Sequence, residues 1–198
     1  MELVSFTSTI RRLILMSSRI IQNNPTLIFI IKAIVLLMLW FGVYEGFLRP
    51  LQQPDRFLIN ITALAGQQFL NLFGYSLHIE AVSEGTAILM EDEALLIIAA
   101  NCNGLAVFSL FAGFVLIFPR QLIQKIVFIP IGLLFLFMLN VARVVVLTLC
   151  QIYHPDWLDF NHKYTFTILI YAAVFGLWML WVNKLAVPTI TQKRLATA

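Results

Sequence analysis

The sequence contains few charged residues. Asp, Glu, Lys and Arg make up 12% of its 198 residues, whereas hydrophobic residues make up 61% and the mean hydropathy is +0.91. An average soluble domain has about 25% charged residues, so this composition excludes an ordinary water-soluble domain and indicates an integral membrane protein. We expect a lipid bilayer as its surroundings and no nucleic-acid partner.

Cysteine is also scarce, with only Cys102 and Cys150 present. The two residues are far apart, and the sequence has no Cys-x-x-Cys pair of the kind that thiol oxidoreductases use. This absence argues against a membrane thiol-disulfide oxidoreductase, which nevertheless stays open as an alternative. A structural disulfide between the two cysteines is a second alternative if both lie at an oxidising face. Taken alone, Cys150 is best interpreted as a small apolar residue that fills space in a membrane helix.

Long hydrophobic runs, by contrast, are abundant. A helix needs about 20 apolar residues to cross the hydrocarbon core of a bilayer. Three segments meet this length, at residues 26–48, 126–150 and 164–187. A fourth, at 102–118, is short by itself but could begin near residue 94. The sequence therefore predicts an all-α integral membrane bundle of about four transmembrane helices.

Charges in the connections predict the orientation of this bundle. Residues 1–25 contain Arg11, Arg12 and Arg19, but the apolar stretch that follows is too long for a signal peptide and has no small-residue cleavage site. We expect a basic amphipathic arm on the membrane surface instead. With this arm, the 119–125 loop and the 188–198 tail in the cytoplasm, the inner side carries eight bases against one acid: Arg11, Arg12, Arg19, Arg120, Lys125, Lys184, Lys193 and Arg194, against Glu2.

The outer connections, residues 49–101 and 151–163, hold most of the acids: Asp55, Glu80, Glu84, Glu91, Asp92, Glu93, Asp156 and Asp159, against Arg49, Arg56 and Lys163. Positive charge collects on the cytoplasmic side of membrane proteins. Both termini are therefore predicted to be cytoplasmic, in a multi-pass protein of the inner membrane.

The outer segment 49–101 is large enough to be a subdomain. Apolar residues recur at helical spacing over 57–73, which predicts an amphipathic helix that ends at Gly74. Residues 75–90 alternate or are β-branched on both sides of Ser83-Glu84-Gly85, which predicts a possible small β-hairpin. The acidic run Glu91-Asp92-Glu93 is interpreted as a solvated loop rather than a metal site.

Arg143 stands out because it lies inside the apolar run of the third predicted span. A charge near the bilayer interior costs at least about 2.5 kcal/mol, so an intramembrane Arg is by default a functional-site hypothesis. The alternative is that its long side chain reaches the headgroups without any further role. A non-enzymatic membrane assembly factor, with Arg143 as an anchor between helices, also remains open.

Three reactive residues approach the outer face from three different predicted spans. Cys102 lies at the start of the second, Arg143 near the end of the third and His162 just before the fourth. An imidazole could take the proton of a thiol nucleophile, and a helix N-terminus would favour the thiolate. A fixed guanidinium could hold a developing oxyanion. Three asparagines could orient these groups: Asn101, Asn103 and Asn140.

The histidine assignment depends on this combination. Taken alone, His162 would be interpreted as a loop histidine, as His78 and His154 are. Cys/His chemistry requires a histidine near the thiol and on the same side of the membrane, and His162 is predicted to meet that requirement.

These residues resemble the exosortase/archaeosortase family of membrane cysteine transpeptidases. The matching elements are Ala100-Asn101-Cys102-Asn103-Gly104-Leu105, then Asn140-Val141-Ala142-Arg143, then His162-Lys163-Tyr164. The resemblance covers about Glu80 to Leu185. Many bacterial members look longer, so this chain looks like a short, core-only member. It differs from many exosortases at Asn103, where a small hydroxyl residue is common.

The resemblance implies a function. Exported proteins with a C-terminal sorting signal, made of a short motif, a transmembrane helix and a basic tail, would be the substrates. Cys102 would form a thioester with the cleaved protein, His162 would act as base and then acid, and Arg143 would stabilise the oxyanion. A cell-envelope acceptor would then take the acyl group on the extracytoplasmic side. The resemblance implies no metal and no organic cofactor.

Overall fold

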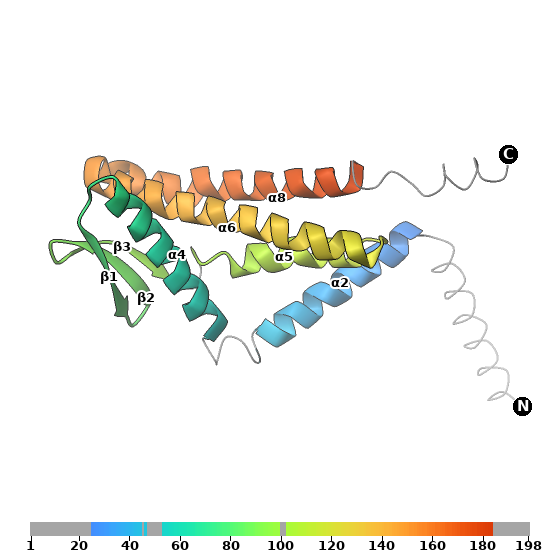
Figure 1. The fold of residues 1–198 in the computed structure, drawn as a ribbon. Coiled ribbons are helices and arrows are strands. Elements are labelled where there is room, and N and C mark those ends of the chain that lie inside the picture. Colours follow the sequence, from blue (N-terminus) through green and yellow to red (C-terminus); the bar gives the residue numbers. More distant parts are fainter. Residues whose placement is uncertain (1–24, 45, 47–52, 100–101, 184–198) are drawn as a thin grey trace, which may run out of the picture.

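The computed structural model describes residues 25–44, 46, 53–99 and 102–183 (Figure 1). The predicted arm, apart from Pro25, and the predicted tail at 188–198 lie outside the described residues. So do Asn101 and the ends of the first and fourth predicted spans. The described chain is mostly helical, with one small sheet at one end of the helices.

The described chain contains four apolar helices: α2 (Pro25–Val43), α5 (Leu105–Ile117), α6 (Leu122–Tyr153) and α8 (Phe166–Asn183). Figure 1 shows α5, α6 and α8 side by side, with α2 crossing them at an angle. Short helical turns connect α6 to α8: η3 (Pro155–Trp157), α7 (Leu158–Phe160) and the π-helical turn η4 (Asn161–Thr165).

Two helical segments are long and apolar enough to cross a membrane, α6 and the continuous run Pro155–Asn183. The 32 residues of α6 extend about 48 Å, which exceeds a hydrocarbon core of about 30 Å. The other two predicted spans are shorter in the described residues. Leu27–Val43 and the 13-residue α5 are apolar helices below that length.

A three-stranded antiparallel sheet follows α4 in the chain and corrects two expectations. Its strands are β1 (Leu77–Val82), β2 (Gly85–Met90) and β3 (Glu93–Ala99), in the order β1-β2-β3. The expected hairpin is therefore part of a larger sheet, and the fold is not purely α-helical. The second span does not begin near residue 94, because residues 93–99 form β3.

The error about the second span has a physical cause. A short apolar run has the same hydrophobicity whether it becomes a buried strand or the first turns of a helix. Pairing with β2, from Met90↔Glu93 to Gly85↔Ala99, decides in favour of the strand. The acidic run supplies the connecting turn, in which Glu91 and Asp92 adopt positive φ angles of 51° and 67°.

Helix α4 (Gln53–Leu72) is the amphipathic helix of the outer segment, and it begins at Gln53 rather than at residue 57. Its buried residues Ile59, Ala63 and Leu70 pack with Ile88 and Ile98 of the sheet. The same cluster includes Val144 and Val145 of α6. This outer core joins the sheet and α4 to the end of α6.

A second core lies among α5, α6 and α8. Its buried members are Phe111, Val115, Leu136, Val174 and Trp181. Trp181 stacks on Phe128 with a centroid distance of 4.8 Å. Since α6 contributes to both cores, its residues between Leu136 and Val144 lie where the helices α5, α6 and α8 meet α4 and the sheet.

Candidate active site

Cys102 lies between β3 and α5. The half-buried residue is followed by Asn103, whose Oδ1 accepts a hydrogen bond from the Leu105 backbone N–H at 2.8 Å and so satisfies one free donor at the start of α5. Gly104, with φ of +83°, makes the bend into the helix. Cys102 therefore lies two residues before the N-cap of α5, beside the N-terminus of that helix.

His162 contacts this thiol. It belongs to the π-helical turn η4, and its Nε2 lies 3.2 Å from Cys102 Sγ. Single π turns inside helices frequently occur at functional sites because the wider turn changes the direction of a side chain. At this separation a proton can pass directly between sulfur and imidazole.

Arg143 approaches the same sulfur from α6. A terminal guanidinium nitrogen lies 3.9 Å from Cys102 Sγ. Among the described residues, Lys163 forms an ion pair with Asp159 and His78 lies 3.9 Å from Asp92, but no carboxylate pairs with Arg143. The thiol is thus a polar neighbour of this cation, which otherwise lies in an apolar helix.

Two of the predicted asparagines support the loop that carries Cys102. Asn140, which is 2% exposed, donates from Nδ2 to the Cys102 carbonyl at 3.4 Å. Asn103 donates from Nδ2 to Asp55 Oδ1, and both residues are buried. The third, Asn101, lies outside the described residues.

Sequence reasoning missed Asp55, which it counted only as an outer charge. Asp55 lies in the first turn of α4, a position that is favourable for an acid but gives no indication of a tertiary partner. One signal was available for its burial, because Asp55 lies four and eight positions before the buried Ile59 and Ala63, on the same face of the helix.

The remaining cysteine and histidines lie outside this group. Cys102 and Cys150 are both free, so the structural disulfide between them is not formed. Cys150 Sγ instead accepts a hydrogen bond from Asn161 Nδ2 at 3.7 Å. Within the described part of the chain, no three His, Cys, Asp or Glu side chains are grouped as a metal site requires.

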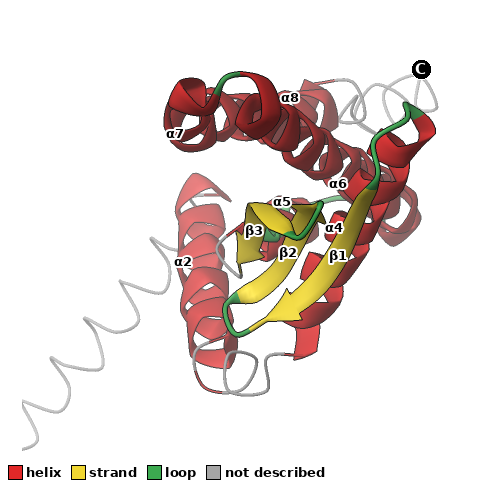
Figure 2. Cartoon of the chain, turned by 90° about the vertical axis from the view of Figure 1, so that its left-hand side faces the viewer, coloured by secondary structure: helices red, strands yellow, loops and turns green. Residues whose placement is uncertain are grey.

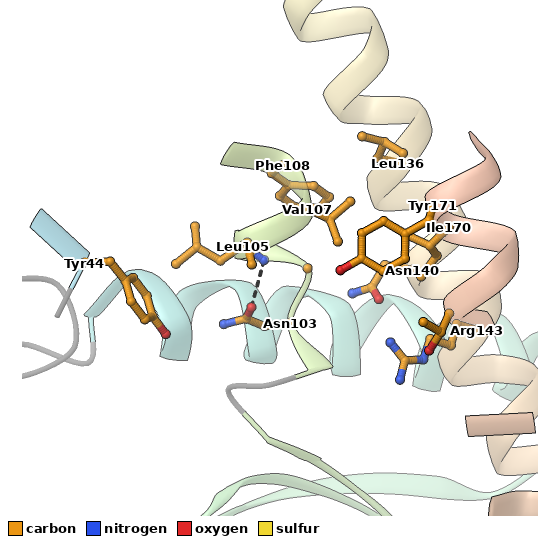
Figure 3. A pocket seen from close by; sticks show the side chains of 13 residues that line it. Tyr44, Asn103, Leu105, Val107, Phe108, Leu136, Asn140, Arg143, Ile170 and Tyr171 are labelled. Carbon is orange, nitrogen blue, oxygen red and sulfur yellow. Dashed lines mark hydrogen bonds between the residues drawn. The ribbon is translucent and has the colours of Figure 1, made fainter. Parts of the chain in front are cut away.

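A cavity of about 320 Å³ opens beside Arg143 and the residues that follow Cys102 (Figure 3). Arg143 and Asn140 of α6 form its polar side, and Tyr171 of α8 and the first turns of α5 form its apolar side. A second, more apolar groove of about 390 Å³ lies among α2, α5 and α8. The cavity and the groove share Ala106, Val107 and Tyr171, so they are neighbours.

Comparison with protein families gives one match. The family described as transmembrane exosortase (Exosortase_EpsH) matches residues 13–182. The chain belongs to the transmembrane exosortase family. The match begins well before Glu80, so the first apolar helix and part of the preceding segment of this exosortase also follow the family pattern.

Searches among curated proteins and among solved structures each found no match. Family membership and the two long apolar helices place this exosortase in a membrane, in a class of sorting-related peptidases and transpeptidases.

Proposed function

We propose that this exosortase is a cysteine transpeptidase that cleaves the C-terminal sorting signal of exported proteins and transfers them to a cell-envelope acceptor. One observation carries the proposal: Cys102 Sγ lies 3.2 Å from His162 Nε2 and 3.9 Å from the Arg143 guanidinium. A nucleophile, a base and an oxyanion donor are the three groups that acyl transfer through a thiol needs.

In the first step, His162 takes the thiol proton as Cys102 Sγ attacks a peptide carbonyl carbon. The carbonyl electrons move to oxygen, and Arg143 stabilises that oxyanion. When the tetrahedral intermediate collapses, the C–N bond breaks and His162 gives its proton to the departing amine. The products are a thioester on Cys102 and a released C-terminal peptide that contains the hydrophobic helix and basic tail.

In the second step, a nucleophile from the acceptor attacks the thioester carbonyl. His162 takes the proton of this nucleophile, the C–S bond breaks, and the sulfur leaves as a thiolate that recovers a proton from His162. The thiolate is a good leaving group beside a cation and a helix N-terminus, so the same charges assist both steps.

The asparagines and Asp55 have a supporting role in this proposal. Asn140 and Asp55 hold the short segment between β3 and α5 through the Cys102 carbonyl and the Asn103 side chain. Catalysis depends on keeping reacting groups within a few tenths of an ångström of their productive positions. Neither residue contacts the thiol in the described hydrogen bonds, so we class both as positioning residues.

The two alternatives make different demands on the cysteines. A thiol-disulfide oxidoreductase requires a second thiol, but Cys150 forms no disulfide with Cys102. A non-enzymatic assembly factor requires neither thiol. The Cys102–His162 contact has no purpose in such a factor, which is why we favour the transpeptidase.

The test compares cells that carry single-residue variants. Exported proteins are analysed by mass spectrometry of their mature C-termini in wild type, Cys102→Ala, Cys102→Ser, His162→Ala and Arg143→Gln. We expect an uncleaved precursor in both Cys102 variants and in His162→Ala, and processing slowed about 100- to 1,000-fold in Arg143→Gln, as on loss of one oxyanion donor.

Two matched controls accompany these variants. Cys150→Ala removes the other thiol, and Arg56→Gln removes an exposed arginine of α4, and both should process normally. Loss of processing in Cys150→Ala would favour the oxidoreductase. Normal processing in Cys102→Ala would refute the transpeptidase.

A further inference from the structure

Strand β3 has one open long edge. It pairs with β2 on one side, and in the described part of the chain no further strand or backbone hydrogen bond occupies its other side. Figure 2 shows β3 on the side of the sheet toward α2, and β1 beside α4. An edge strand presents unpaired N–H and C=O groups that can pair with another extended segment.

The opposite edge of the sheet differs, because α4 covers its start. The Leu77 N–H of β1 donates to Asn71 Oδ1 at 2.9 Å. The Leu77 carbonyl accepts from Gln67 Nε2 at 2.9 Å and from Asn71 Nδ2 at 3.0 Å. The two edges are therefore not equivalent, because among the described residues no side chain forms a hydrogen bond with the backbone of β3.

The open edge also leads to the nucleophile. Strand β3 ends at Ala99, three positions before Cys102. Three residues extend at most about 11 Å, so the end of the strand lies within that distance of the reactive residue. A peptide paired along β3 and running in the same direction would bring a carbonyl to Cys102 a few residues later.

The space beyond Cys102 suits the rest of such a peptide. The cavity is lined by Arg143 and by Asn103 and Gly104, which follow Cys102, and the neighbouring apolar groove lies among α2, α5 and α8. A substrate would thus be extended before the cleaved bond and helical after it. The bound substrate would then have the same order of structure as this protein around Cys102, where strand β3 comes before helix α5.

We propose that the open edge of β3 binds the segment that precedes the cleaved bond of the exported protein, as an added parallel strand. Main-chain hydrogen bonds would then align the reacting carbonyl with Cys102 Sγ. Ile97 on β3, 46% exposed, would contact the added segment. This inference rests on the proposed function and specifies how the substrate is recognised.

The first test uses synthetic peptides and the wild-type protein. Their sequence is taken from the precursor that accumulates uncleaved in Cys102→Ala cells. Each of the six residues before the cleaved bond in turn receives an amide-to-ester replacement, which removes one N–H donor. Because alternate residues of a strand direct their N–H to opposite sides, we expect kcat/KM to fall about three- to tenfold at every second position only.

The second test places a photocrosslinking residue in the Cys102→Ala protein, which holds the precursor without cleaving it. Ile97→p-benzoylphenylalanine probes the open edge, and Val82→p-benzoylphenylalanine is the matched control on β1, where Val82 is 36% exposed. We expect the Ile97 variant alone to crosslink to the segment before the cleaved bond.

Several results would overturn the inference. These are an ester series without alternation, equal crosslinking from both positions, or crosslinking of Ile97 to a second copy of the chain. In all of these cases the wild-type protein would still form a thioester on Cys102. Absence of that thioester would instead refute the proposed function.

Discussion

Arg143 shows how one residue connects the two halves of this exosortase. A guanidinium cannot lose its proton to avoid burial, and no described carboxylate pairs with it. Arg143 lies on α6 between the core that α4 forms with the sheet and the second core among α5, α6 and α8. This position places its guanidinium beside Cys102 Sγ. The half-buried guanidinium lines the cavity, where it can stabilise negative charge that develops on the thiolate or on an oxyanion.

Gly104 supports a prediction about a single backbone position. Its φ is +83°, and an added Cβ would meet the Phe108 ring at 3.2 Å. Gly74 has a similar φ of +91° but open space around it, which makes Gly74→Ala a matched control. Both substitutions should destabilise the fold by about 1–2 kcal/mol through the left-handed backbone.

Only Gly104→Ala should also displace Cys102, because only there must the side chain of Phe108 or the loop itself move. We expect slower alkylation of Cys102 by iodoacetamide in Gly104→Ala and an unchanged rate in Gly74→Ala, with Cys150→Ala as the background of both. Thermal unfolding in detergent measures the shared effect. Equal alkylation rates in the two variants would show that Gly104 is needed only for the turn.

At the level of elements, α4 does more than cover the sheet. Its outer core with β2, β3 and α6 fixes the end of β3, while its first turn supplies Asp55 to the loop that follows β3. The Cys102 segment is thus held from both sides, by α6 through Asn140 and by α4 through Asp55.

Asp55 can be tested with a conservative and a disruptive variant. Asp55→Ala leaves the Asn103 amide, which is 2% exposed, without its acceptor and should cost about 1–3 kcal/mol. Asp55→Asn keeps an oxygen that can accept the same hydrogen bond. We expect precursor processing to be slow in Asp55→Ala and to be largely rescued in Asp55→Asn.

Two measurements separate a positioning role of Asp55 from a role in stability: kcat at saturating peptide and the amount of active enzyme. Displacement of Cys102 lowers kcat at saturating peptide, whereas partial unfolding lowers the amount of active enzyme, which titration of the Cys102 thiol measures. Glu84→Ala, at an exposed acid in the β1–β2 turn, is the control. Equal loss in Asp55→Asn and Asp55→Ala would mean that the carboxylate charge, rather than the hydrogen bond, is required.

In the whole molecule, the candidate site lies at the junction of a membrane bundle and a sheet-containing subdomain. The apolar helices α5, α6 and α8 supply Arg143 and the turn that carries His162, and the sheet leads into Cys102. A hydrophobic substrate segment and an extended peptide can therefore both reach the thiol, one along the helices and one along the sheet.

The predicted orientation places this junction on the extracytoplasmic side. In spheroplasts, a membrane-impermeant maleimide should label Glu84→Cys in a Cys102→Ala, Cys150→Ala background. Gln121→Cys in the same background should be labelled only after permeabilisation. Both positions are exposed, so access to the residue does not differ. The reverse pattern would place the sheet and the thiol in the cytoplasm and exclude exported proteins as substrates.

Much of the chemistry could be predicted without coordinates, because it follows from residue types. A guanidinium in an apolar run, a cysteine followed by a helix-starting Asn-Gly, and a histidine before the last apolar run each violate a local expectation. The membrane location follows in the same way from the length and number of apolar runs. These properties depend on the sequence alone, since lipid and water select them whatever the packing.

The tertiary structure decided the features that depend on pairing between distant segments. The apolar run after Glu93 could have continued into the second helix, and only its pairing with β2 made it a strand. The choice of Asn103 as the partner of Asp55 depended on how α4 packs, which local periodicity does not encode. The contact of Cys102 with His162 joins residues sixty positions apart, so only the packing of α5, α6 and α8 could bring sulfur and imidazole to 3.2 Å.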